Sequence, residues 1–205
     1  MLAAEIAALS ATVLSGSRLV PQIRKLVTTG DTSGVSFSYA TLGVVSEVGW
    51  LTYSMQRGLW LAVPDAAMMT VVYLLLVRAQ VRAQAPVGRA IGLTAAWAAA
   101  LAGAALLGGS QAVSVVLPVG LAVQLAPAVW SAFRSAAPTG VSLASWVMAL
   151  GESLLWGSYA LPAGDLAYLG LSVLGVVAAV LIGGRVLMTS RRSPAALTIV
   201  EPAMV

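Results

Sequence analysis

Three acidic residues lie inside apolar stretches of the chain, where a charged side chain is costly to bury. Glu47 precedes Trp50 by three residues, and Glu152 precedes Trp156 by four. At about 100° per residue on a helix, each carboxyl lies within about 60° of its tryptophan and shares its face. The third acid, Asp65, stands near the start of another apolar stretch. Because ionisable groups at membrane depth mark solute and proton pathways, these acids are candidates for binding a polar solute or a proton.

The two tryptophans have two interpretations. Trp50 and Trp156 stand near the ends of apolar stretches, where an aromatic belt meets the membrane interface. Tyr53 and Tyr159, one turn further out, fit that belt better. The tryptophans would then face the interior, where an indole offers an apolar face to sugar C–H groups and an N–H to hydroxyls. We therefore predict that the two tryptophans flank a bound solute.

Each acid also has a structural interpretation. Glu47 and Glu152 could be protonated or bonded to a neighbouring helix, and Asp65 could stabilise a helix start through the macrodipole. Asp165 fits a helix cap better than a ligand. Arg18 either snorkels to the cytoplasmic face or pairs with a carboxyl. The sequence leaves these alternatives open.

Composition restricts both the environment and the chemistry. The 205 residues are 60% hydrophobic and 9% charged, whereas soluble domains average about 25% charged residues. A lipid environment follows. The chain has no Cys and no His, which excludes thiolate or imidazole metal sites, haem ligation and Cys- or His-based catalysis. We predict no cofactor, no metal and no enzymatic activity, and the net charge of +4 does not indicate a nucleic-acid partner.

Seven apolar segments are predicted to cross a bilayer as helices. They cover residues 3–25, 35–55, 60–79, 88–108, 111–132, 142–161 and 165–187. Nine basic residues lie at the ends of the odd-numbered segments or after them, and only Arg57 lies between the second and third. The positive-inside rule then predicts an amino terminus outside and a carboxyl terminus in the cytoplasm.

The chain matches itself at a shift of 106 residues, without gaps. Pro21 falls on Pro127, and the Ser-Gly-Val-Ser run at 33–36 falls on Thr-Gly-Val-Ser at 139–142. Further along, Trp50, Tyr53 and Gly58 fall on Trp156, Tyr159 and Gly164. Each repeat therefore holds three helices, and the segment 88–108 is the single crossing that makes the two repeats parallel.

This duplication, with Pro21-Gln22 ending the first helix, resembles the PQ-loop superfamily, and within it the SWEET and SemiSWEET sugar transporters. The resemblance covers about residues 5–187 and rests on the duplicated motifs above. It implies an all-α membrane fold of seven helices, in which two parallel three-helix bundles are joined by a linker helix. The parts are residues 1–86 for the first repeat, 87–110 for the linker, 111–188 for the second repeat and 189–205 for a disordered cytoplasmic tail.

The same resemblance implies a transporter in the plasma membrane that moves a small polar solute, a sugar by family, by alternating access. The candidate solute-binding residues are Trp50, Trp156, Asp65, Ser172, Glu47 and Glu152. The hinge at the cytoplasmic gate comprises Pro21, Gln22 and Pro127. Asp65 stands about where the family carries a pocket Asn, and Ser172 lies beside the matching position of the second repeat; this chain has no Asn.

Two other functions stay open. In a proton-coupled carrier of an amino acid or cationic solute, the acids would hold protons or pair with a positive solute. A non-transporting membrane receptor or scaffold would bind its ligand without net flux. One chain already contains both repeats, so it can form a pathway alone, and its oligomeric state is open.

Overall fold

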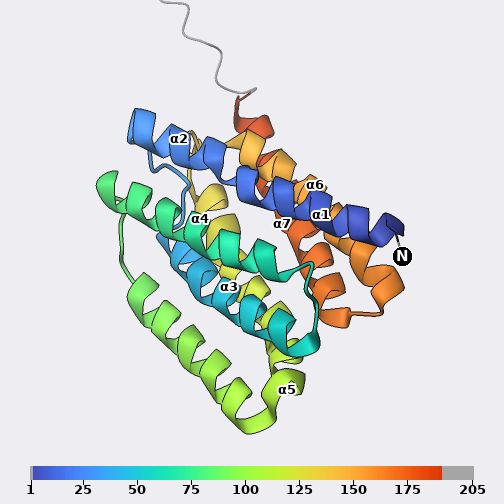
Figure 1. Cartoon of the computed structure of the whole chain (residues 1–205). Coiled ribbons are helices and arrows are strands. Elements are labelled where there is room, and N and C mark those ends of the chain that lie inside the picture. Colours follow the sequence, from blue (N-terminus) through green and yellow to red (C-terminus); the bar gives the residue numbers. More distant parts are fainter. Residues whose placement is uncertain (1, 191–205) are drawn as a thin grey trace, which may run out of the picture.

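Helices make up nearly all of residues 2–190, the part of the chain that the computed structural model describes (Figure 1). No strand occurs among these residues, so the predicted all-α class is confirmed. The helices are α1 (Leu2–Arg18), α2 (Val20–Thr29), α3 (Phe37–Arg57), α4 (Val63–Arg82), α5 (Ala90–Arg134), α6 (Leu143–Ala163) and α7 (Leu166–Ser190).

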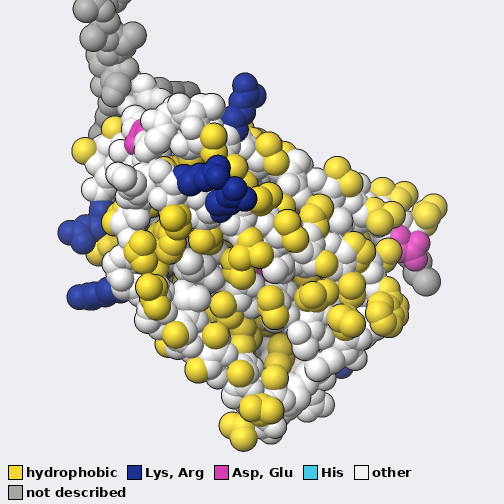
Figure 2. Space-filling model, turned by 60° about the vertical axis from the view of Figure 1, so that its left-hand side comes forward, with side chains coloured by type: hydrophobic (Ala, Val, Ile, Leu, Met, Phe, Trp, Pro, Cys, Tyr) yellow, Lys and Arg dark blue, Asp and Glu magenta, His cyan; other side chains and the backbone are white. Residues whose placement is uncertain are grey.

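Four helical segments are long and apolar enough to cross a membrane. They are Leu2–Thr29 (α1 with α2), α4, α5 and α7. The other two helices, α3 and α6, are 21 residues long each, and each carries a glutamate. Apolar side chains cover much of the surface in Figure 2, and the basic side chains gather toward its upper left. These features are those of a membrane protein.

The duplicated sequence motifs form duplicated helix ends. The side chains of Ser36 and Ser142 each accept the backbone N–H three residues on, at 3.2 and 3.4 Å, and so cap α3 and α6. Gly58 (φ 68°) and Gly164 (φ 64°) end these helices in the left-handed conformation that glycine favours. The helix bounds shift from 37 to 143 and from 57 to 163, the 106-residue shift of the sequence repeat.

The long α5 is broken at Gly109, whose φ of 57° and ψ of −149° are not helical. The break lies between the segments predicted at 88–108 and 111–132. The two parts form a hairpin (Figure 1), and the Trp97 ring of the first part covers Gly120 of the second so closely that a Cβ there would overlap it. The indole N–H of Trp97 also donates to Ser46 Oγ on α3 at 3.0 Å. The first part of α5 therefore ties the hairpin to α3.

The two repeated prolines differ in their effect on the backbone. The predicted segment 3–25 is two helices, which meet at Leu19, and Pro21 lies in the first turn of α2. Proline suits a first turn because its missing N–H has no helical partner there. Pro127 lies inside α5, where Gly109 is the residue that departs from helical φ/ψ. Of the two predicted hinge prolines, only Pro21 therefore lies at a break in its helix.

The end of α7 corrects the predicted tail. The helix runs to Ser190, so Thr189 and Ser190 are helical and do not belong to a disordered segment. The rest of the predicted tail, residues 191–205, lies outside the described residues.

Helix α1 packs against α6 of the second repeat as well as against α4 of the first repeat, and so brings the two repeats into contact. One apolar cluster surrounds Trp50 and Trp156. A second surrounds Tyr39 and Tyr73. The cavity described next is lined by members of both clusters.

Candidate functional site: a polar cavity between the repeats

A cavity of about 50 Å³ lies among helices of both repeats. Five of the six predicted solute-binding residues line it, namely Glu47, Trp50, Asp65, Glu152 and Trp156. A water molecule needs roughly 10–15 Å³ of such space, so the cavity has room for a few waters or a small polar group, not for a sugar ring.

Ser172, the sixth predicted residue, does not line the cavity. It is buried between α7 and α6, with its hydroxyl so close to Gly157 that a Cβ on that glycine would collide with it. Its neighbour Leu171 lines the cavity instead. Leu171, which the 106-residue shift matches to Asp65, therefore faces the cavity, and the polar Ser172 beside it does not.

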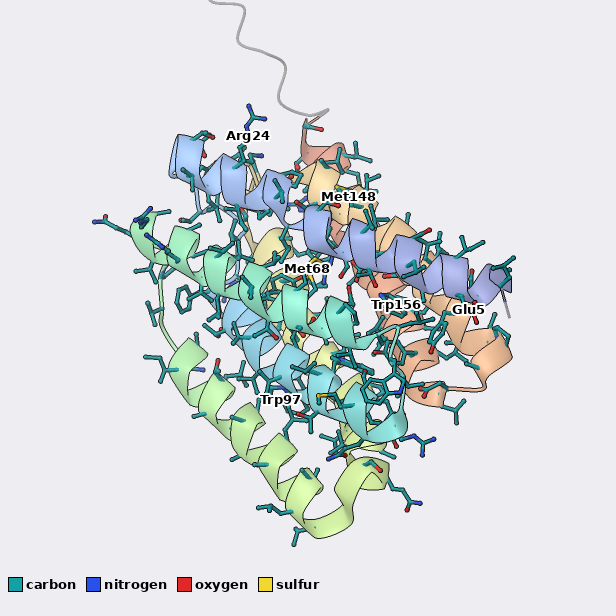
Figure 3. All side chains as sticks on the ribbon, viewed as in Figure 1. Glu5, Arg24, Met68, Trp97, Met148 and Trp156 are labelled. Carbon is teal, nitrogen blue, oxygen red and sulfur yellow. The ribbon has the colours of Figure 1, made fainter. Side chains whose placement is uncertain are left out.

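Aromatic rings close one end of the cavity. Trp50 and Trp156 are 3% and 1% exposed, and both ring centroids lie 4.9 Å from that of Tyr168 on α7. The predicted inward position of the tryptophans is confirmed, and in Figure 3 Trp156 lies within the bundle whereas Glu5 and Arg24 point outward. Sequence reasoning missed Tyr168, which has no aromatic match in the first repeat.

A hydrogen-bonded layer covers these rings. Asp165 Oδ1 accepts the backbone N–H groups of Ala167 and Tyr168 at 3.0 and 3.1 Å, which confirms its predicted role as a helix cap. Its other oxygen accepts the Tyr53 hydroxyl proton at 3.1 Å. Tyr53 is 2% exposed, so its side chain packs inside the protein rather than facing lipid as a belt residue would. Ser54 and Tyr168 share a further hydrogen bond of 3.0 Å.

A buried ion pair lies at the cavity wall between α1 and α6. Arg18 forms a salt bridge with Glu152, so the pairing alternative for Arg18 is the correct one. Ser15 donates to the other oxygen of Glu152 at 3.1 Å. Arg18 also donates to the hydroxyls of Tyr39 and Tyr73, both at 3.2 Å. Removing one partner of such a pair typically costs about 3–5 kcal/mol, because the other charge stays buried.

The two tyrosines extend this network to α3, α4 and α5. Their hydroxyls lie 3.0 Å apart, and Gln124 Nε2 of α5 donates to Tyr73 at 3.0 Å. Gly43 makes room for the Tyr73 ring, because a Cβ there would collide with it. Sequence reasoning missed both tyrosines. The available signal was a pair of phenols inside otherwise apolar helices.

The remaining two acids have free carboxyl oxygens. Asp65 is 8% exposed, and its Oδ1 is buried with no hydrogen-bond partner among residues 2–190. Asp65 lies in the first turn of α4, as its interpretation as a helix-start acid requires, and Ala62 occupies the cap position. Glu47 is half-buried and forms no hydrogen bond within the described part of the chain. These acids do not belong to any group of three or more that could hold a metal ion among the described residues.

At the opposite end from the aromatic rings, Gln22 joins α2 to the start of α6. Its Nε2 donates to the Gly140 carbonyl at 2.9 Å, and its Oε1 accepts from the Ser142 N–H at 2.7 Å. Its own N–H donates to Ser145 Oγ at 3.1 Å. The predicted gate residue therefore makes direct contacts between the two repeats.

The loops next to Gln22 also meet. The Gly140 N–H donates to the Ser33 carbonyl at 3.0 Å, and a Cβ at Gly140 would collide with the backbone of the first loop. A hydrogen bond from Thr139 lowers the pKa of Asp31, and Asp31 also accepts the Ser33 N–H at 2.8 Å. A second cavity, of about 40 Å³, lies between these loops and Arg18.

Comparison with models of known protein families gives no match, and no curated protein matches the chain either. The site is therefore interpreted from its own geometry. It is a small polar cavity between two repeats, with aromatic rings at one end and, beyond the second cavity, hydrogen bonds between the repeats at the other.

Proposed function

We propose that the protein is a membrane transporter that moves a small polar solute by alternating access between two three-helix repeats. The observation that carries the proposal is the central cavity, which residues of both repeats line. Aromatic rings lie at one end of it, and the Gln22 contacts between the repeats lie beyond the other end, next to the second cavity. A carrier that exposes one site alternately to two sides needs a contact that can open on each side of that site. Trp50 and Trp156 would flank the solute, with Asp65, Glu47 and Glu152 as its polar contacts.

The proposed topology has seven membrane crossings. α1 with α2 forms the first crossing, and the two parts of α5 form the fourth and fifth. The fourth would be the linker between two parallel bundles. Arg82 and Arg134 lie in the last turns of α4 and α5, and Arg24 and Lys25 lie within three residues of Gln22 in α2. These basic residues support a cytoplasmic position for the end that holds the Gln22 contacts. The amino terminus would then lie outside, in the plasma membrane.

The two closures suggest how the carrier would switch. Release of the Gln22 bonds to Gly140 and Ser142 would open the cytoplasmic end. Separation of Tyr168 from the two tryptophans would open the outer end. Pro21 lies one residue before Gln22, at the break between α1 and α2, and is the proposed hinge. The family resemblance implies a sugar as solute, whereas the three acids and one arginine that line the cavity favour a positively charged solute.

A reversible cross-link tests transport. Thr139 hydrogen-bonds Asp31 across the two loops, so Asp31→Cys with Thr139→Cys should form a disulfide that fixes the cytoplasmic closure. The native chain has no cysteine, so no other disulfide competes. Proteoliposomes carrying this variant would be assayed with labelled sugars, amino acids and amines.

Uptake above that of protein-free vesicles, lost on oxidation and restored by a thiol reductant, is the expected result. Each single-cysteine variant is the matched control and should be insensitive to oxidant. Binding of a solute without flux under either condition would contradict the proposal and favour a receptor or scaffold.

A further inference from the structure

We infer that the central cavity binds a small organic cation, an ammonium ion that carries no carboxylate of its own, through Asp65, Glu47 and the faces of Trp50 and Trp156. The proposed transport function is needed only to explain how the ion reaches the cavity. The binding site itself is argued from the groups that line the cavity.

The cavity has more acidic than basic groups. Glu47, Asp65 and Glu152 line it, and Arg18 is the basic residue among its lining residues in the described part of the chain. A buried carboxylate is stable only when it is paired or hydrogen-bonded. One guanidinium can neutralise one of these three acids. The other two call for a proton or a cation from outside the chain.

Glu152 is the acid whose partner is present. Both of its oxygens are engaged, one by Arg18 and the other by Ser15. Arg18 is engaged in turn by the hydroxyls of Tyr39 and Tyr73. Both members of the Arg18–Glu152 pair therefore already have partners, and no other basic group lines the cavity in the described part of the chain to hold a carboxylate of a solute. An amino acid would bring such a carboxylate into the cavity, which disfavours it.

Asp65 is the acid with a buried oxygen left unpaired, although Ser15 is a hydrogen-bonding neighbour of its carboxyl group. Its side chain is more than nine-tenths buried and its Oδ1 has no donor among residues 2–190. An ammonium group supplies up to three donors and a charge at once. Glu47 of α3 also lines the cavity, forms no hydrogen bond in the described residues and is the second carboxyl available to that group.

The aromatic wall adds a second attraction for a cation. Trp50, Trp156 and Tyr168 meet at one end of the cavity, with Tyr168 4.9 Å from each indole. The electron-rich faces of such rings attract cations, and aromatic cages recognise ammonium ligands. A cavity of about 50 Å³ holds a few waters. It suits a cation of a few non-hydrogen atoms, such as methylammonium or ethanolamine, rather than a sugar ring.

A set of size-matched probes tests the charge requirement on the unaltered protein. Ethanolamine carries an ammonium group, ethylene glycol is its neutral counterpart, and glycine adds a carboxylate to the same ammonium. Equilibrium binding would be measured by calorimetry on the full chain in lipid nanodiscs, with glucose as the fourth probe. We expect saturable binding of ethanolamine and at least tenfold weaker binding of the other three. Equal binding of glycine, ethylene glycol or glucose would overturn the inference, as would no binding of ethanolamine.

A pair of variants locates the site. Asp65→Asn keeps the shape of the side chain and removes its charge, so ethanolamine affinity should fall at least tenfold. Glu5→Gln removes an exposed acid of α1 that points away from the cavity, and should leave the affinity unchanged (Figure 3). Wild-type affinity in Asp65→Asn would overturn the assignment of that residue and with it the inference.

Flux measurements separate this inference from the proposed function. Ethanolamine binding without uptake into proteoliposomes would support the cation site and contradict transport. Glucose uptake without ethanolamine binding would overturn the cation site and leave the transport proposal standing. Asp65→Asn need not be stable for either conclusion, because both use the wild-type chain.

Discussion

Replacing Gln22 by leucine should loosen the contact between the repeats at the Gln22 end, because one side chain makes two of the bonds between them. Gln22→Leu removes the donor to the Gly140 carbonyl and the acceptor of the Ser142 N–H, at 2.9 and 2.7 Å. Both backbone groups belong to buried residues. Leaving a buried group unpaired costs about 1–3 kcal/mol, and we take the low end for each because water can enter from the adjoining cavity. The closed state should therefore lose about 2 kcal/mol, which raises the open fraction about 30-fold.

A single cysteine at Ala128 reports this opening. Ala128 lines the cavity next to Gln22 and is 6% exposed. Because the native chain has no cysteine, maleimide labelling of Ala128→Cys is specific. When opening is fast relative to labelling, the labelling rate follows the open fraction, so Gln22→Leu should raise it about 30-fold.

Gln80 supplies the matched control. It is a buried glutamine lining the same cavity, and it makes one bond of 3.2 Å, to the Ser36 carbonyl, while its Oε1 has no partner among the described residues. Gln80→Leu loses one weak bond and removes an unpaired acceptor, so the labelling rate should change a few-fold at most. An unchanged rate in Gln22→Leu, or an equal rise in both variants, would refute the argument.

Three further predictions concern stability and are measured by thermal melting in detergent or nanodiscs. Gly120→Ala places a methyl group against the Trp97 indole and should lower the stability of the folded protein by about 1–3 kcal/mol. Gly103→Ala adds a methyl group where there is open space and should raise the stability by up to about 1 kcal/mol. Equal effects of the two substitutions would contradict the packing of Trp97 on Gly120. Asp165→Ala should cost about 1 kcal/mol through loss of the cap and Asp165→Asn much less, and equal losses would argue against capping. The Thr139 hydrogen bond lowers the pKa of Asp31, so its carboxylate adds stability above the unfolded pKa that is lost as pH falls through the folded value. Asp31→Asn should accordingly flatten the acid side of the melting-temperature profile, and an unchanged profile would contradict this.

Local signals made the helix ends predictable. A serine cap and a left-handed glycine act within one turn, so the bounds of α3 and α6 follow from residues such as Ser36 and Gly58. The inward position of Trp50 and Trp156 was predicted from their place one turn deeper than Tyr53 and Tyr159, although Tyr53 is itself buried. These features need no knowledge of how the helices pack against each other.

Side-chain partners across helices were not predictable, because they depend on the rotation of each helix about its axis. Arg18 and Glu152 lie far apart in the chain, and nothing near either residue indicates the other. Ser172 and Leu171 differ by about 100° around α7, and the packing of Ser172 on Gly157 decides which of them faces the cavity. A polar residue one place from the matched position was therefore the wrong choice.

The repeats share a backbone but divide the polar chemistry between them. Arg18 and Gln124 are matched by the 106-residue shift, and both donate to the same hydroxyl of Tyr73. Only the first repeat has Gln22, and Ala128 at the matched position cannot make the reciprocal bonds. A rotation of one repeat against the other would therefore break the contacts of Gln22 at one end without breaking equivalent contacts from the second repeat. The side-chain bonds of Gln22 therefore come from one repeat alone, and beside them the Gly140 N–H donates to the Ser33 carbonyl. Separation of the two repeats at this end needs only these few bonds to change.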